Sequence, residues 1–321
     1  MALLGIDIGG TKIAFALFDD EGNIETKEIL AIGNRRGTEV GNLITVTAAL
    51  MLEKACSNGD PVESIGISVP GISRSDKGTV WAPNIPGWDD YPLMKEVRTV
   101  AEHLPVIITS DRVCYISGEG WKGNARGCRD AIFLAVGTGI GAGIIVNGEI
   151  LRGFDNVSGA IGWMALSRPF KSKYAICGCF EYYASGEGIA RQAAEYLARH
   201  ESYEGEMRLD DAGKITSQDV FSAFHKGDTV ASEIILQAVE FWGMATANLV
   251  SLFNPEKIIF GGGVFGPATE LIPEIKREAE KWAQPISIRQ VTFEASALAG
   301  DAGVYGAGFL AKKLLDDQKN R

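Results

Sequence analysis

Two short stretches of the chain carry the residue types that phosphate groups need. Asp7-Ile8-Gly9-Gly10-Thr11-Lys12 and Gly137-Thr138-Gly139 each lie between two apolar runs. Glycine turns expose consecutive backbone N–H groups with no β-carbon in the way, so phosphate oxygens can approach closely. Lys12 adds a cation, and the Asp7 carboxylate is placed to hold Mg²⁺, directly or through water. A plain hairpin would explain one such turn, but two of them, with a further run at Gly261-Gly262-Gly263, favour phosphate binding.

These turns differ from the two commonest nucleotide-binding motifs. The chain has neither GxxxxGK[ST] nor a strand–GxGxxG–helix fingerprint at these places. The pattern therefore disfavours P-loop and dinucleotide-binding enzymes. The predicted nucleotide-binding residues are Asp7, Gly9, Gly10, Thr11, Lys12, Gly137, Thr138, Gly139, Gly261, Gly262 and Gly263.

Asp111 is the candidate catalytic carboxylate. It follows a short apolar run at 106–109, and the carboxyl ends of such strands are where α/β sheets bind ligands. A carboxylate there could accept the proton of an attacking hydroxyl during phosphoryl transfer. From the residues alone, a helix N-cap or Asx turn is the preferred explanation of this aspartate, and the catalytic role is the alternative.

Cys177-Gly178-Cys179-Phe180-Glu181 combines two thiols with a carboxylate, as part of a metal site would. Structural zinc needs four ligands at fixed spacing, and no histidine lies near in the sequence. The five cysteines are odd in number and scattered, which is typical of reduced thiols. We expect no zinc site.

The elements around these residues form two similar units. The segment 2–24 reads as strand, glycine turn, strand and hairpin turn, and 131–148 repeats that order and ends in the type I′ signal Asn147-Gly148. A helix is predicted from Thr38 to Cys56, mostly helical pattern from 186 to 252, and a last helix from 302 to 318 with small residues early on. We predict two α/β lobes around a cleft: 1–111, completed by the helix at about 302–321, and 112–301.

Composition restricts the function further. The net charge of −10 argues against nucleic-acid and acidic-membrane partners, which select clustered Lys and Arg. The N-terminal residues do not read as a signal peptide, and no run approaches the ~18–20 apolar residues of a membrane span. We expect a cytoplasmic protein.

Seven motifs resemble the ROK family (repressors, open reading frames and kinases) of the actin–hexokinase superfamily. They are GIDIGGTK at 5–12, VPG at 69–71, APNIPGW at 82–88, Asp111, VGTGIGAGII at 136–145, CFEYYASG at 179–186 and NPEKIIFGGGV at 254–264. The resemblance implies a two-lobed actin-like ATPase (ribonuclease H-like) fold and an ATP- and Mg²⁺-dependent sugar kinase. It also implies a homodimer.

The resemblance assigns roles by position. The glycine turns match the phosphate turns, 261–264 matches the segment beside the adenosine, and Asp111 matches the catalytic base. The residues assigned to the sugar are Gly71, Asn84, Ser110, Asp111, Trp163 and Glu181.

The chain departs from the family pattern around the sugar and the zinc. Ala160 and Trp163 stand where the family has a carboxylate and an imidazole, and Ser172 and Tyr174 replace two cysteines. We therefore expect weak activity on glucose and better activity on a modified ring, because an aromatic face suits apolar C–H groups. We also expect the loop 168–176 to be held by Trp163, Phe170 and Tyr174 or to be mobile.

Two functions stay open at this point. One is ATP-dependent phosphorylation of a hexose or hexose-like polyol such as a cyclitol, with Asp111 as base. The other is a ligand-sensing protein that keeps the fold and a pocket but little catalysis.

Overall fold

The computed structural model describes residues 2–200 and 202–319. Its contacts divide the chain into two compact units. The first comprises Met1–Gly127, Leu151–Ser158 and Asp301–Arg321, and the second comprises Cys128–Ile150 and Gly159–Gly300. Each unit is an α/β structure with its own five-stranded mixed sheet, so the predicted two-lobed fold is confirmed.

The first unit is built on the sheet β3-β2-β1-β4-β7. β2 is antiparallel to β1 and β3, whereas β1, β4 and β7 are parallel to one another. The strands are β1 (Ala2–Ile8), β2 (Lys12–Phe18), β3 (Ile24–Ala31), β4 (Val62–Val69) and β7 (Val106–Ser110), with a small hairpin of β5 (Ile72–Arg74) and β6 (Thr79–Trp81). The helices are α1 (Thr38–Ser57), α2 (Leu93–Arg98), α3 (Asp111–Lys122) and α10 (Ala302–Lys319).

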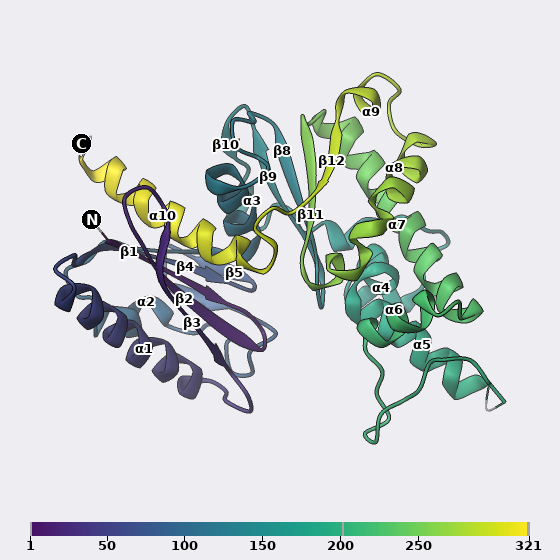
Figure 1. Ribbon diagram of the computed structural model, residues 1–321, viewed down its shortest axis with the longest axis horizontal. Helices are drawn as coiled ribbons and strands as arrows, with labels where there is room; N and C mark the ends of the chain where they lie inside the picture. Colours follow the sequence, from purple (N-terminus) through teal and green to yellow (C-terminus); the bar gives the residue numbers. More distant parts are fainter. Residues whose placement is uncertain (1, 201, 320–321) are drawn as a thin grey trace. The chain divides into compact units, whose positions relative to one another are not determined.

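Helices α1 and α10 cover opposite faces of this sheet (Figure 1). Alternate residues of β1 point to the two faces, so Leu4 and Ile6 pack with α1 while Leu3 packs with α10. The early part of α10 lies very close to its neighbours, because β-carbons on Gly66 and Gly306 would overlap the carbonyl oxygens of Ala307 and Cys114. The small residues of this helix are therefore a packing requirement.

The unit boundary differs from the predicted one. The first unit ends at Gly127 and not at Asp111, because α3 packs extensively against α10. Leu151–Ser158 also returns to the first unit. No local sequence signal marks either feature, since both depend on which helix packs on which sheet.

The second unit repeats the topology of the first. Its sheet has the order β10-β9-β8-β11-β12, with β9 antiparallel to β8 and β10, and β8, β11 and β12 parallel. The strands are β8 (Ala131–Val136), β9 (Ile140–Val146), β10 (Glu149–Ile150), β11 (Lys257–Gly261) and β12 (Thr292–Ala295). The helices are α4 (Cys179–Ala184), α5 (Gly186–Arg199), α6 (Ser217–His225), α7 (Thr229–Phe253), α8 (Ile272–Glu280) and α9 (Ser287–Gln290). Short 3-10 helices at 161–163 and 172–175 precede α4.

The long helix α7 corrects one expectation from the sequence. By length and composition it is apolar enough to span a membrane, although no such segment was expected. About two thirds of the most apolar stretch of α7 is buried, and Trp242 and Val250 of this helix belong to the core of the second unit. The apolar character of α7 is thus explained by packing within the second unit.

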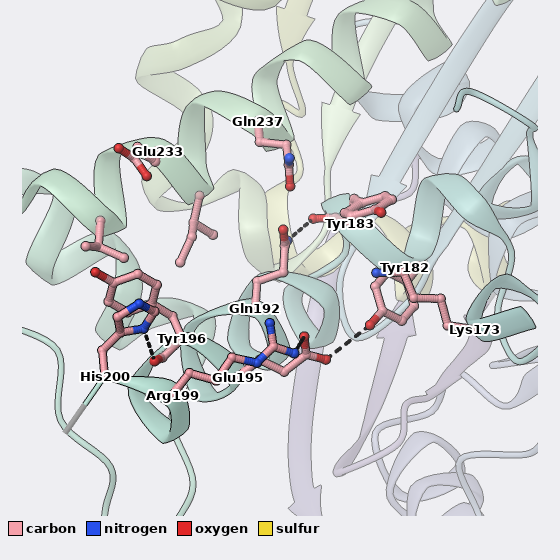
Figure 2. A pocket seen from close by; sticks show the side chains of 12 residues that line it. Lys173, Tyr182, Tyr183, Gln192, Glu195, Tyr196, Arg199, His200, Glu233 and Gln237 are labelled. Carbon is pink, nitrogen blue, oxygen red and sulfur yellow. Dashed lines mark hydrogen bonds and ion pairs between the residues drawn. The ribbon is translucent and has the colours of Figure 1, made fainter. Parts of the chain in front are cut away.

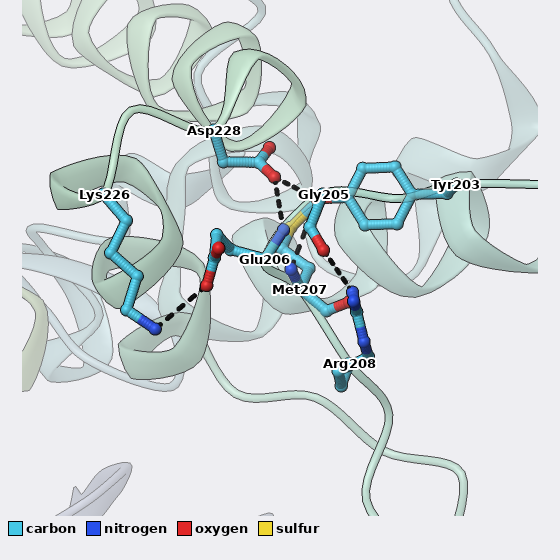
Figure 3. Close-up of polar contacts among 7 residues, drawn as sticks. All are labelled: Tyr203, Gly205, Glu206, Met207, Arg208, Lys226 and Asp228. Atoms are coloured by element: carbon cyan, nitrogen blue, oxygen red, sulfur yellow. Dashed lines mark hydrogen bonds and ion pairs between the residues drawn. The ribbon is translucent and has the colours of Figure 1, made fainter.

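Asp228 joins the start of α7 to the segment 203–206. Its buried carboxylate accepts hydrogen bonds from the Glu206 backbone N–H group, at 2.7 Å, and from the Tyr203 hydroxyl (Figure 3). It also accepts one from the Ala231 backbone N–H group at 2.8 Å. The Asp228 side chain therefore caps the N-terminus of α7 and also holds the segment 203–206 in place.

Candidate functional site

The first glycine turn is a tight connection between β1 and β2. Gly9 N–H donates to the Lys12 carbonyl at 2.9 Å, and the Thr11 carbonyl accepts from Ile32 N–H at 2.8 Å. Gly10, Thr11 and Lys12 form an exposed tip. Backbone hydrogen bonds hold the shape of the turn, and the exposure of its tip makes it available to a ligand.

The second glycine turn lies in the same place between β8 and β9. Gly137 N–H donates to the Gly139 carbonyl at 2.9 Å, and Thr138 is exposed. The Gly137 carbonyl accepts from Gly186 N–H at 2.8 Å, which joins the turn to the first residue of α5. Ser185 caps that helix by accepting from Gly188 N–H at 2.9 Å.

The third glycine run lies beside the second turn. A β-carbon on Gly262, whose φ is +90°, would meet the carbonyl oxygen of Val136, and one on Gly261 would meet the ring of Phe133. These two glycines therefore allow the end of β11 to pack against the end of β8. A β-carbon on Gly263 would meet nothing within 4 Å, so that position is open.

Asp7 lies in register with Ser68 on β4, and Ser68 with Thr109 on β7. Paired residues share a face of the sheet, and this face carries α10, since a β-carbon on Gly303 would overlap the Asp7 carboxylate. Burial raises the pKa of Asp7 to about 6, the Ser68 hydroxyl opposes this, and the Asp111 charge adds to it. The carboxylates of Asp7 and Asp111 and the Ser68 hydroxyl would offer a metal ion only oxygen ligands.

That ligand set fits Mg²⁺. Among residues 2–200 and 202–319, no three His, Cys, Asp or Glu side chains gather into a cage for a metal. Mg²⁺ usually binds through one or two carboxylates, with water and substrate phosphates completing the shell. The Ser68 hydroxyl is buried beside the Asp7 carboxylate, whose ionised form it favours, and adds a third oxygen to this set.

Asp111 is the first residue of α3, directly after β7. Its Oδ1 accepts from Arg112 N–H at 2.8 Å, and its Oδ2 accepts from the Tyr115 hydroxyl at 3.4 Å. The side chain is partly exposed, and burial raises its pKa to about 6, against the opposing charge of Arg112. The carboxylate is thus oriented, accessible, and ready to take a proton near neutral pH.

The other first-unit residues assigned to the sugar have different surroundings. Asn84 is exposed and lies beside the first glycine turn. A β-carbon added to Gly10 would lie 3.4 Å from the Cβ of Asn84. A β-carbon on Gly71 would overlap the Trp81 carbonyl, so this glycine is needed for close packing. Ser110 is buried in the N-cap position of α3, but its side chain does not cap the helix.

Glu181 belongs to the second unit and lies against its glycine turn. Its Oε2 accepts from Ile140 N–H at 2.7 Å, and β-carbons on Gly139 and Gly162 would each lie 2.8 Å from that oxygen. Burial raises the pKa of Glu181, and the Ile140 bond opposes this. The two glycines form a narrow slot for the carboxylate.

The loop before α4 is only partly as predicted. Tyr174 is buried, with 4% exposure, but Trp163 and Phe170 are 57% and 75% exposed. The three aromatics therefore do not form the predicted apolar plug. Of the three, only Tyr174 enters the core, where it contacts tyrosines of α4, while the exposed Phe170 ring packs edge-on against it at 6.1 Å. All five cysteines are free thiols.

Sequence analysis missed Arg152 and Ser68. Arg152 Nη1 donates to Thr109 Oγ1 at 3.3 Å, which places a cation at the end of β7. No motif surrounds Arg152; its place depends on the return of 151–158 to the first unit. Ser68 precedes the VPG motif and could have been found from the register of β4 with β1.

Comparison with known proteins identifies the family. The ROK family profile matches residues 3–314. The glucokinase of Halalkalibacterium halodurans is 36% identical over 318 residues, which are 97% of this chain and 94% of that protein. The crystal structure of a ROK family glucokinase from Streptomyces griseus, in complex with glucose and AMPPNP, covers 98% of this chain and all of its own, with TM-score 0.78 and 29% identity. The ROK hexokinase from Thermus thermophilus covers 99% of this chain and all of its own, with TM-score 0.79 and 27% identity.

Each of these matches covers nearly the whole of this chain and of the relative. The motifs, the repeated sheet topology and the relatives agree, and the chain belongs to the ROK family, as an ATP-dependent sugar kinase with the actin–hexokinase fold.

Proposed function

We propose that this kinase transfers the γ-phosphoryl group of ATP to a hydroxyl of a hexose or a closely related ring, with Asp111 as general base. The observation that carries the proposal is the Asp111 carboxylate, which is oriented by two hydrogen bonds, partly exposed and has a pKa of about 6. At pH 7 this carboxylate is mostly ionised and still basic enough to accept a proton.

In the proposed reaction, Asp111 accepts the proton of the sugar hydroxyl as the hydroxyl oxygen attacks the γ-phosphorus. The bond between the γ-phosphorus and the β–γ bridging oxygen breaks, and ADP leaves. Lys12 and the backbone amides at the tips of the two turns, those of Gly10, Thr11, Thr138 and Gly139, bind phosphate oxygens, whose charge they stabilise. Mg²⁺, held by Asp7 directly or through water, would neutralise charge on the phosphates. The segment Gly261–Gly263 lies beside the second turn and suits the adenosine.

The sugar is proposed to bind Gly71, Asn84, Ser110, Asp111 and Glu181, with Trp163 as an aromatic face. Glucose is the sugar bound in the Streptomyces griseus structure, and it is the first substrate to test. Ala160 and Trp163 replace two polar groups of the family pattern, so we expect a KM for glucose above ~1 mM, the upper end of the usual range. The exposed Trp163 ring is available to stack on an apolar sugar face.

The test is ADP release with MgATP and a panel of sugars and cyclitols, each at several concentrations. Sugar-dependent ADP release, with the phosphorylated product identified by mass, supports the proposal. Release that does not depend on any sugar would contradict it. By family resemblance we also propose a cytoplasmic homodimer.

A further inference from the structure

Lys173 lies among the rings of three tyrosines. Its Nζ is 4.2 Å from the ring centroid of Tyr182, 4.9 Å from that of Tyr183 and 5.9 Å from that of Tyr174. The Tyr174 and Tyr183 hydroxyls are hydrogen-bonded at 3.0 Å. We call these three tyrosines the tyrosine cage. The contacts of the Lys173 ammonium group with the rings of Tyr182 and Tyr183 join the loop segment 172–175 to α4.

The tyrosine cage is anchored to the rest of the second unit. Tyr183 stacks on Phe241 of α7 at 4.7 Å, and the Tyr182 hydroxyl donates to Glu195 of α5 at 3.1 Å. Lys173, Tyr182 and Tyr183 form one side of an open pocket of about 280 Å³, and α5 and α7 form the other sides (Figure 2). Lys173 therefore holds the loop to an element that is itself fixed on two sides.

The loop is connected to Glu181 in two ways. Tyr182 follows Glu181 directly on α4, which is only six residues long. Gly178 N–H donates to the Tyr174 carbonyl at 2.8 Å, and the Gly178 backbone packs against Gly162, which lines the slot of the Glu181 carboxylate. Movement of Tyr174 would thus displace both the start of α4 and one side of that slot.

We propose that Lys173 is a positioning residue for sugar binding: its contacts with the tyrosine cage keep Glu181 in place. This inference rests on the proposed function, because Glu181 contacts the sugar only if the chain is the sugar kinase described above. Lys173 itself touches no reacting atom. Its charge is what matters, because a neutral side chain of the same length would keep the packing but lose the attraction of the rings.

The experiment compares Lys173→Met, which removes the charge, with Lys173→Arg, which keeps it. The matched control is Lys276→Met: Lys276 is partly buried like Lys173, and its Nζ lies over one ring, that of Phe293, at 5.8 Å. Three quantities are measured: the KM for the sugar, the KM for ATP, and hydrogen exchange of the Ile140 amide. That amide donates to Glu181 Oε2, so its exchange reports the position of Glu181 without any need for catalysis.

For Lys173→Met we expect a sugar KM raised about five- to tenfold, a scale between those of exposed and desolvated cation–π contacts, because Lys173 is partly buried. The kcat and the KM for ATP should stay within about twofold. Ile140 should exchange several-fold faster. Lys173→Arg and Lys276→Met should stay within about twofold of wild type in every measurement.

The proposal is overturned if Lys173→Met leaves the sugar KM and Ile140 exchange unchanged, or if Lys173→Arg is as damaging as Lys173→Met. Equal changes in the KM for ATP would also overturn it, since they indicate general loss of structure. If wild type phosphorylates no sugar, the proposed function fails. Ile140 exchange then decides alone whether Lys173 positions Glu181.

Discussion

Replacing Asp111 with Asn should abolish most activity while raising stability at neutral pH. Asn keeps the size of the side chain, and its carbonyl oxygen can still accept from Arg112 N–H, but it cannot accept a proton. We expect kcat to fall about 100-fold or more, the usual scale for a lost general base. The KM for the sugar should change little.

The gain in stability follows from the raised pKa of Asp111. Burial moves this pKa from 3.8 to about 6, and each pKa unit corresponds to ~1.4 kcal/mol, so the ionised carboxylate costs the folded state up to about 3 kcal/mol. The cost is absent below pH 3.8, grows between pH 3.8 and 6, and is complete above pH 6. At pH 5 it is therefore about half of its full value.

Arg112 reduces the expected gain in stability. Its guanidinium is partly buried and is stabilised by the negative charge of Asp111, and the substitution removes that charge. We expect Asp111→Asn to stabilise by ~1–2 kcal/mol at pH 8, or about 2–6 °C in Tm, and by less at pH 5. Thermal denaturation of both proteins at pH 5 and pH 8, beside initial rates, makes the comparison. Wild-type turnover in the variant would refute the role as base. A loss of stability at pH 8 would refute the argument from burial.

Three further predictions concern other residues, and a fourth concerns the oligomeric state. Asp7→Asn should raise the Mg²⁺ concentration for half-maximal activity about tenfold, measured by titration at fixed ATP; an unchanged value would remove Asp7 from the metal site. Gly178→Ala should lower Tm much more than Gly59→Ala, because both glycines have positive φ (+86° and +80°) but only a β-carbon on Gly178 would overlap backbone; equal losses would contradict this. Trp163→His combined with Ala160→Glu should lower the KM for glucose; no change would show that these positions do not set the preference. Light scattering at micromolar concentration should give twice the chain mass of 34.4 kDa, and a monomer mass would contradict the homodimer.

The fold was largely predictable because its strong signals are local. Glycine turns between apolar runs indicated β1–β2 and β8–β9, and Asn147 and Gly148, both with positive φ, form the predicted hairpin turn. The unit boundary was not predictable, because α3 joins the first unit through contacts with α10, about 190 residues further along the chain. The same is true of Arg152.

The positions of the candidate site residues were predictable, because glycine turns and strand ends have local signals. The structure places the glycines in turns between paired strands and Asp111 directly after β7, and their roles in phosphate binding and catalysis stay predictions. Trp163 was harder, because an aromatic residue serves equally well in a core and on a surface. Its 57% exposure decides between these uses, and sequence alone does not contain that number. Lys173 was missed because its partners are aromatic rings, and cation–π contacts have no fixed spacing in the sequence.

The two units share a backbone arrangement but differ in charge. In the first unit, Asp7 stands two residues before the glycine turn and Lys12 ends it. At the equivalent places of the second unit stand Ala135 and Gly139. A charged carboxylate brought in by a separate helix, Glu181, instead binds the backbone just after the second turn. Under the proposed function, the first unit supplies the groups for a cation and for proton transfer, while the second supplies amides and Glu181. A duplicated strand–turn–strand unit needs only its glycines to keep its shape, so the flanking positions were free to specialise.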